Sequence, residues 1–524
     1  MRLVALLCAL VLAVLSACSS TTDESSGDRT LRIVTPDGVP ADFYLGTAYP
    51  LGIFSMYQLA WPLFLPGEDD FSIVNGLASS YQASKDGLVH TIGVRKGFTF
   101  HDGSAIDATA VGKVLNSYFF TGDPLRDQGP YGVVSAAFGS PSIVREVKVV
   151  DPETLRIALS QPRSDIRDPL FQMPILNPAV LAKPGYGKNV EDLRNAGSGP
   201  FRITAFSPGE FVEFERYPEF PEQVSLDRLR LQQVPDPAAR ALALQGNDAD
   251  VVLDLAPEDH ERLAKMDGNK EYTATPSSNV FLRFLTPKPP QLQDPRVRRA
   301  IWLALDRDAY RGTFFNPSNS QEIDQPVVVE GVDGYADGLT DLDHDLAKAK
   351  ALLQEAGVQQ LTLRTLTMES SGPILSLRRL HEAIAADLKK IGIEVKIDVV
   401  DSATYFSDRY KYDYEVLWYG NSFNPDFIFR LFYLGYPKPW TAPNPLADRR
   451  VADLVTKAST EADRAKQVAA WQQLQRLNSN ELLMGIPIAS VGTAAVASNR
   501  VQEFNLGWNN RGALVWLFKN VSVG

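Results

Sequence analysis

The sequence has very few of the side chains that build disulfides, metal clusters or cysteine nucleophiles. Its 524 residues include 2 cysteines, 5 histidines and 6 methionines. Cys8 lies inside an apolar N-terminal run, and Cys18 follows that run directly. We therefore expect no disulfide, no metal site, no cofactor and no cysteine-based catalysis in the processed chain.

Motifs of hydrolysis and nucleotide binding are missing as well. The sequence has no Gly-x-Ser-x-Gly elbow and no Gly-x-x-x-x-Gly-Lys-Ser/Thr phosphate loop. His260-Glu261 and His381-Glu382 both lack the second histidine that a zinc protease helix carries four residues after the first. The carboxylates of Asp248 and Asp250 are explained adequately by a solvated turn. These absences argue against an enzyme, and an extracellular hydrolase with an unrecognised site is the alternative of another class.

The charge balance is acidic, with a formal net charge of −11 at pH 7. Such a charge repels phosphate backbones, so we expect no nucleic-acid partner. Hydrophobic residues make up 44% of the chain, which is enough for two or three globular lobes with full-sized cores.

The first residues are typical of an export signal. Arg2 precedes an apolar run over residues 3–15, which is too short to span a membrane. Residues 15–18 read LSAC and resemble the lipobox of bacterial lipoproteins. That resemblance implies a signal peptide at 1–17, a lipid-modified (palmitate-bearing) Cys18, a polar tether at 18–28, and attachment to the extracytoplasmic face of the bacterial cell membrane. An ordinary secretory signal with an incidental cysteine is the alternative.

Alternating helix and strand patterns predict an α/β fold. Residues 393–399 alternate strictly between apolar and polar side chains, and a helix with one apolar stripe precedes them over 377–391. A second helix is predicted from Asp343 to Ala356, and a third begins at Asp294-Pro295.

The stretch from 76 to 111 carries a specific family resemblance. Residues 76–81 read GLASSY, residues 85–87 read KDG, and residues 94–104 read VRKGFTFHDGS. These segments resemble the signature of the family 5 solute-binding proteins, the peptide-, dipeptide- and nickel-binding receptors of ABC importers. Within this signature we expect His101 and Asp102 to hold a turn and Asp107 to cap a helix, rather than to bind ligand.

The resemblance continues in order along the chain, with GSGPF at 197–201, LQGNDADV at 244–251 and DPRVRRA at 294–300. It implies a two-lobed clamshell of the periplasmic-binding-protein type. Lobe I would comprise residues 29–277 and 485–524, with an inserted subdomain at about 50–185, and lobe II would comprise residues 278–484. Two crossing strands would act as hinges for closure over a buried ligand.

The resemblance also implies a function. The chain would be a monomeric substrate-binding lipoprotein that captures peptides or a peptide-like solute and delivers it to the permease and ATPase subunits of an ABC importer. A receptor for a nickel chelate or an opine-like ligand is the alternative, although imidazole and thioether ligands for a soft metal are scarce.

The ligand-facing segment of lobe II in this family corresponds to residues 418–426, which read WYGNSFNPD. Peptide receptors place an aspartate, which pairs with the ligand's ammonium, where Asn421 falls. Three explanations stay open: the ligand lacks a free amine there, Asp426 substitutes, or the alignment is shifted by one residue. The candidate ligand-binding residues are Tyr44, Tyr49 and Phe54 in lobe I, and Trp418, Tyr419, Gly420, Asn421, Phe423, Asp426 and Trp440 in lobe II.

Overall fold

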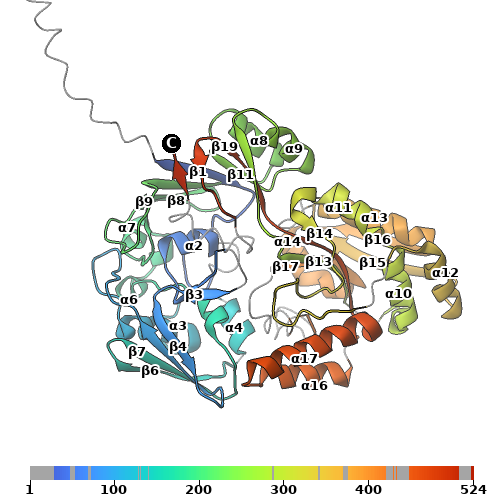
Figure 1. Cartoon of the computed structure of the whole chain (residues 1–524), viewed down its shortest axis with the longest axis horizontal. Helices are drawn as coiled ribbons and strands as arrows, with labels where there is room; N and C mark the ends of the chain where they lie inside the picture. The colour runs from blue at the N-terminus through green and yellow to red at the C-terminus, as the bar shows by residue number, and fades with distance from the viewer. Residues whose placement is uncertain are drawn as a thin grey trace, which may run out of the picture.

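The computed structural model describes residues 29–47, 53–68, 72–127, 129, 131–139, 141–285, 288–339, 343–369, 376–420, 429, 432–433, 446, 448–506 and 521–524. Within these residues the chain is a mixed α/β protein with three large β-sheets, as Figure 1 shows. The α/β class predicted from the sequence is confirmed.

The first large sheet has seven strands and joins segments from both ends of the chain. Its central strand β1 pairs in parallel with its two neighbours, and β19 pairs antiparallel with the strands on either side of it. Helices α8 (Pro237–Gln245) and α9 (Pro257–Ala264) belong to this part of the chain. In order across the sheet, the strands are β12 (Asn269–Thr273), β19 (Ala494–Ser498), β11 (Val251–Leu253), β1 (Thr30–Thr35), β10 (Arg228–Gln233), β9 (Phe211–Arg216) and β8 (Phe201–Ser207).

Asp250 precedes β11 and ties the two ends of the chain together. Its side chain is fully buried, and it forms ion pairs with Arg32 at 2.8 Å and with Arg500 at 3.0 Å. The backbone amide of Arg32 also donates to this carboxylate, at 2.8 Å. The prediction of a solvated turn was therefore wrong for Asp250, because residues far away in the sequence supply its partners.

The second large sheet has four antiparallel strands, and its residues lie in the sequence between β1 and β8 of the first sheet. In order, they are β4 (Ala78–Ala83), β5 (Val89–Val94), β7 (Thr154–Leu159) and β6 (Val144–Asp151). Helix α3 (Ala108–Phe119) begins at the predicted cap, since the Asp107 carboxylate accepts from Ala110 N at 2.8 Å. The other elements of this region are α2 (Ile53–Leu59), β2 (Phe64–Pro66), β3 (Ile73–Asn75), α4 (Gly132–Phe138), α5 (Arg167–Phe171), α6 (Pro178–Leu181) and α7 (Val190–Arg194).

The third large sheet has six strands. Their order is β14 (Ser320–Gln321), β18 (Gly485–Val491), β13 (Ser278–Phe284), β17 (Tyr414–Gly420), β15 (Leu361–Thr367) and β16 (Ile393–Val399). The helices of this part are α10 (Pro295–Ala304), α11 (Arg307–Phe314), α12 (Leu346–Glu355), α13 (Leu377–Lys390), α14 (Ser402–Asp408), α16 (Arg449–Ser459) and α17 (Arg464–Leu477).

Local sequence signals placed several of these elements correctly. α13 and β16 lie where the periodicity predicts them, and α10 begins after Asp294, whose carboxylate accepts from Arg296 N at 2.8 Å. The helix predicted from Asp343 begins later, at Leu346. The reason is that Asp345, in an extended conformation, caps it by accepting from Lys348 N at 2.9 Å.

Two large hydrophobic clusters divide the described chain into two lobes, and a third, small cluster packs α8 and α9 against the seven-stranded sheet. The larger cluster packs the seven-stranded sheet and the region of the four-stranded sheet together around side chains such as Trp61, and we refer to this part as lobe I. The second packs the six-stranded sheet against its helices around Trp302 and Trp471, and this part is lobe II. No residue belongs to both clusters. Each lobe therefore has a core of its own.

The expected lobe boundary at residue 485 does not agree with the strand pairing. β18 pairs with β13 in the six-stranded sheet of lobe II, whereas β19 pairs in the seven-stranded sheet of lobe I. The pairings favour a boundary between these two strands. The remaining boundaries stay predictions.

Two segments cross between the lobes side by side. Ala274 N donates to Thr493 O at 2.8 Å, and Ser277 N donates to Val491 O at 3.2 Å. A Cβ atom on Gly492 would lie 2.4 Å from Ala274 O, which is closer than real contacts allow. Only glycine therefore lets the two crossing segments approach this closely.

A buried ion pair joins the two middle strands of lobe II. Arg283 on β13 lies opposite Glu415 on β17, with Arg283 Nε 3.0 Å from Glu415 Oε1, and Tyr405 donates to the other carboxylate oxygen at 2.8 Å. Burial alone would raise the pKa of Glu415. The charges of Arg283 and Arg409, together with the hydrogen bonds, outweigh burial and hold this pKa below its usual value.

We predict that Glu415→Gln lowers the free energy of unfolding of lobe II by about 3–5 kcal/mol, because the Arg283 charge is left buried without its counter-charge. Because its pKa is depressed in the folded state, Glu415 contributes stability above its unfolded pKa, and that contribution is lost as the pH falls through the folded value. Urea denaturation at pH 7 measures the change. Glu382→Gln, which breaks the exposed pair with Arg378 on α13, is the control and should leave stability almost unchanged.

Candidate functional site

Strand β17 leads into the segment that the sequence singles out for ligand binding. It pairs antiparallel with β13, which places Trp418 opposite Val280. Trp418 is half-buried and packs against the hydrophobic core of lobe II. Of its two predicted roles, ligand contact and core packing, the structure shows the second. A half-buried ring retains an exposed part that could contact a ligand.

The structure describes few of the other predicted site residues. The backbones of Tyr419, Gly420 and Phe54 are described as the end of β17 and part of α2. The remaining predictions lie outside the described residues and stay predictions: Cys18, Tyr49, Asn421, Phe423, Asp426 and Trp440.

Tyr44 lies on lobe I in a network of tyrosines and one aspartate. Its ring meets that of Tyr186 edge to face, with centroids 5.1 Å apart. Tyr186 OH donates to Asp127 Oδ2 at 2.7 Å, and the backbone amide of Gly46 donates to Asp127 Oδ1 at 3.2 Å. A Cβ atom on Gly187 would lie 2.7 Å from the Tyr44 ring. The half-buried Tyr44 is thus held firmly in the wall of lobe I.

His101 and Asp102 belong to the scaffold, as predicted. His101 is 4% exposed, and its Nε2 lies 3.0 Å from Gly199 O. Asp102 accepts from Asn177 Nδ2 at 2.7 Å and from Ser104 N at 2.9 Å. Both side chains join the 100–104 turn to the rest of lobe I.

An acidic hollow of about 270 Å³ lies on lobe II. Burial, and next Asp324 and Glu330, raise the pKa of Tyr335 above its usual value. Arg307 Nη1 donates to Ile323 O at 2.9 Å, and its Nη2 lies 3.6 Å from Glu322 Oε1, so one of the three lining carboxylates already has a cationic partner. The sequence signal that could have found the hollow is the stretch from 322 to 337, which has acidic but no basic residues. The hollow is lined by Gln321, Glu322, Ile323, Asp324, Glu330 and Tyr335.

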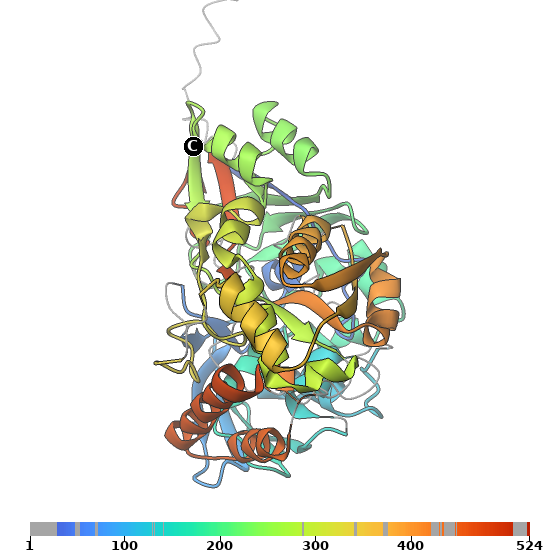
Figure 2. The same ribbon diagram turned by 90° about the vertical axis from the view of Figure 1, so that its right-hand side faces the viewer.

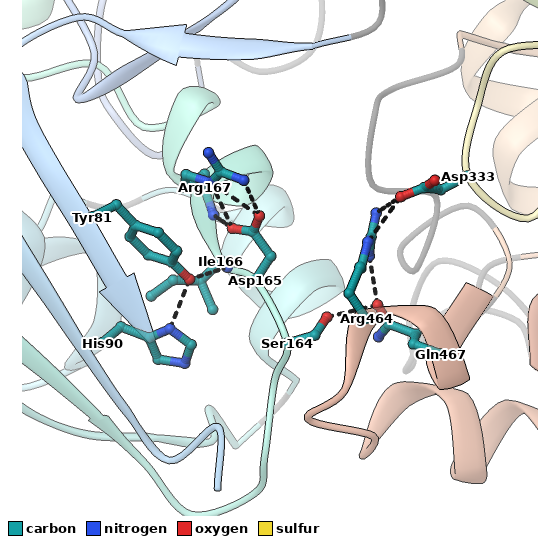
Figure 3. A network of polar contacts seen from close by, with 9 residues as sticks. All are labelled: Tyr81, His90, Ser164, Asp165, Ile166, Arg167, Asp333, Arg464 and Gln467. Carbon is teal, nitrogen blue, oxygen red and sulfur yellow. Dashed lines mark hydrogen bonds and ion pairs between the residues drawn. The ribbon is translucent and has the colours of Figure 1, made fainter. Parts of the chain in front are cut away.

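The two lobes also contact each other through side chains. Far from the crossing segments, Ser164 Oγ of lobe I donates to Gln467 Oε1 of lobe II at 2.7 Å, as Figure 3 shows. Beside the crossing segments, Ser318 Oγ of lobe II donates to Glu271 Oε1 of lobe I at 2.5 Å. The described lobes therefore touch each other both beside the crossing segments and far from them.

Within the part of the chain that the structure describes, no group of three or more histidine, cysteine, aspartate or glutamate side chains is arranged to hold a metal ion. No described helix combines the length and the apolar character needed to cross a membrane.

Comparison with known proteins places the chain among solute receptors. Residues 72–440 match the family described as bacterial extracellular solute-binding proteins, family 5 Middle. The dipeptide-binding protein of Escherichia coli (strain K12) is 26% identical over 467 residues, which cover 84% of this chain and 85% of that protein.

Solved structures share the fold. DppA of Helicobacter pylori, a periplasmic binding protein in complex with the peptide STSA, superposes with a TM-score of 0.79 at 19% identity and covers 94% of this chain and 98% of its own. NikA of Brucella suis, in complex with Fe(III)-EDTA, gives 0.80 at 21% identity, covering 94% and 100%. The predicted two-lobed clamshell is confirmed.

The buried histidines predict how stability depends on pH. Burial lowers the pKa of His101 and of His381 to about 4. In the unfolded chain both would titrate near 6.5. The unfolded state therefore binds more protons between these values, and stability falls as the pH drops from about 6.5 toward 4, by about 1.4 kcal/mol per pH unit for each histidine.

Urea titrations at pH 7, 6 and 5 measure this slope. His101→Gln, whose side-chain amide can donate to Gly199 O, should reduce it by about one proton. His344→Gln, at an exposed position, is the control and should leave it unchanged. An equal slope in His101→Gln and the wild type would contradict the assignment.

Proposed function

This chain belongs to the family 5 bacterial extracellular solute-binding proteins, and we propose that it is the lipid-anchored receptor of an ABC importer for peptides or a peptide-like solute. It is a solute-binding transport component rather than an enzyme, and it works outside the cytoplasm. It would act as a monomer and deliver its ligand to a permease driven by separate ATPase subunits.

The observation that carries the peptide proposal is the dipeptide-binding relative, whose similarity extends over most of both chains. The fold agrees with it, since a peptide-bound protein superposes over nearly the whole chain. A ligand with an ammonium group would also suit the carboxylates of the acidic hollow on lobe II.

The ligand's amino group is the point on which the specificity depends. An ammonium facing the neutral amide of Asn421 would lose a charge-assisted hydrogen bond, which costs about 2–5 kcal/mol. Either the ligand lacks a free amine at that position, or another carboxylate such as Asp426 takes the place of the missing charge, or the aspartate lies one residue away in the alignment.

We expect that a library of di- to tetrapeptides contains members that raise the melting temperature of the purified chain, because a ligand that binds only the folded state stabilises it by mass action. A ligand at 100 times its Kd adds about 2.7 kcal/mol. Differential scanning fluorimetry measures the shift. No response to any peptide would exclude peptides as the ligand of this receptor.

The matched control is the N-acetylated form of each peptide that binds. If a carboxylate holds the ammonium, acetylation should weaken binding at least tenfold by isothermal titration calorimetry. If the ligand chemistry has changed around Asn421, acetylation should have little effect. The two results distinguish the open explanations for this position.

The anchor gives a second prediction. Cys18→Ala should abolish labelling by radioactive palmitate and release the protein from the membrane fraction, because two acyl chains give durable attachment and none remains. Cys8→Ala, inside the predicted signal, is the matched control and should retain both. Labelling that survives in Cys18→Ala would exclude this cysteine as the lipid site.

A further inference from the structure

A buried contact joins lobe I to lobe II between the loop at 160–167 and the helices α16 and α17. Arg163 Nη1 donates to Ser459 O at 2.5 Å, next to the bond from Ser164 Oγ to Gln467 Oε1. Arg163 is 5% exposed, Ser459 7% and Gln467 1%. Water is therefore largely excluded from the bond between Arg163 and Ser459, whereas the half-buried Ser164 lies at the edge of the contact.

The lobe I side of this contact is held rigidly. Ile166 N donates to Tyr81 OH at 3.1 Å, and Tyr81 OH lies 2.8 Å from His90 Nδ1, as Figure 3 shows. His90 Nε2 lies 3.2 Å from Gly87 O and donates to that carbonyl, so Nδ1 of the neutral ring accepts the proton of Tyr81 OH. Arg163 N donates to Gly87 O at 2.9 Å. The loop is thus fastened to the hairpin formed by β4 and β5.

The two lobes also pack tightly at this hairpin. A Cβ atom on Gly87 would lie 2.7 Å from Arg163 O and 3.2 Å from Ala462 Cβ, so the hairpin, the loop and the turn between α16 and α17 meet at one point. Gly87 has a φ of +66°, a conformation that favours glycine.

The lobe II side connects the contact to the acidic hollow. Gln467 Nε2 donates to Ala458 O at 2.9 Å, and Arg464 donates both to Gln467 and, through Nε at 2.8 Å, to Asp333. Asp333 lies between Glu330 and Tyr335, which line the hollow. A rearrangement of this segment would therefore shift the partners of Ser164.

The position of the contact determines how far its atoms separate when the lobes open. Figures 1 and 2 both show α16 and α17 at the end of lobe II opposite the crossing segments. When two bodies rotate about an axis near the crossing segments, the atoms farthest from that axis move most. The contact at Arg163 and Ser164 is therefore the first to break when the lobes open.

We propose that Arg163 and Ser164 of lobe I, with Ser459 and Gln467 of lobe II, form an interlobe latch that sets the balance between the closed and open states. This latch acts in the unliganded protein and does not depend on which solute is bound. It supplies part of the closing free energy, so that a ligand needs to supply only the remainder.

The latch can be tested by measuring the distance between the lobes. The full chain with Cys8→Ser and Cys18→Ser has no other cysteine, so spin labels can be attached at Glu146→Cys on β6 and Lys457→Cys on α16, both exposed. Pulsed electron paramagnetic resonance without ligand then gives the closed and open populations. Ser164→Ala and Arg163→Met, which keeps the aliphatic stem, remove the latch bonds one at a time.

We expect each variant to raise the ratio of open to closed protein by about 2- to 10-fold, the effect of one net hydrogen bond. Ser318→Ala, which removes the interlobe bond beside the crossing segments, is the matched control and should change the ratio less. Circular dichroism checks that each variant folds. If Arg163→Met does not fold, the result for Ser164→Ala alone tests the latch.

Three results would overturn the latch: a wild-type protein without a closed population, no change in either latch variant, or an equal change in Ser318→Ala. Because no ligand is added, these results are separate from the peptide titrations. A protein that binds no peptide could still show the latch, and a peptide receptor could lack it.

Discussion

The paired crossing segments are the constraint on which the rest of the structure depends. Residues 274–278 and 491–494 run between the lobes and share backbone hydrogen bonds, and the lack of a side chain at Gly492 allows their close approach. Asn319 of lobe II is bound to the same point, since Gly492 N donates to Asn319 O at 2.8 Å. Each crossing segment connects a strand of the seven-stranded sheet to a strand of the six-stranded sheet. A shear of the lobes would break these strands, whereas a rotation about the crossing segments would not.

Buried charges hold each lobe together on either side of this connection. In lobe I, Asp250 accepts from Arg32 near the start of the described chain and from Arg500 near its end. In lobe II, Arg283 and Glu415 link the strands that flank the sheet's middle. Such pairs are costly to break, because removal of one partner leaves the other charge in a medium of low dielectric constant. The lobes can therefore move as rigid bodies while their interiors stay unchanged.

Closure is then governed by contacts outside the two cores. Ser318 and Glu271 meet close to the crossing segments, whereas Arg163 and Ser164 meet lobe II at the far end. Opening changes the distance between two atoms very little when they lie near the axis of rotation, and it changes that distance strongly when they lie far from the axis. The acidic hollow is linked to the distant contact through Asp333 and Arg464.

The sequence by itself determined the features that depend on neighbouring residues. The cap at Asp107, the start of α10 after Asp294, and the boundaries of α13 and β16 follow from side chains within four residues or from a local period. The family also followed from the sequence, because its motifs are contiguous. The same motifs predict that the segment after β17 faces the ligand, and its residues from Asn421 to Asp426 stay predictions.

Only the tertiary structure decided which distant residues become partners. Arg163 and Ser459 are separated by 296 positions in the sequence, and Ser164 and Gln467 by 303. No local sequence pattern therefore predicts either bond. For the same reason Asp250 looked like a turn residue, and β18 was assigned to the wrong lobe. The periodicity of a segment shows which of its side chains face inward. The residues that surround those side chains are brought there only when the chain folds. Burial and pairing across hundreds of residues are properties of that environment.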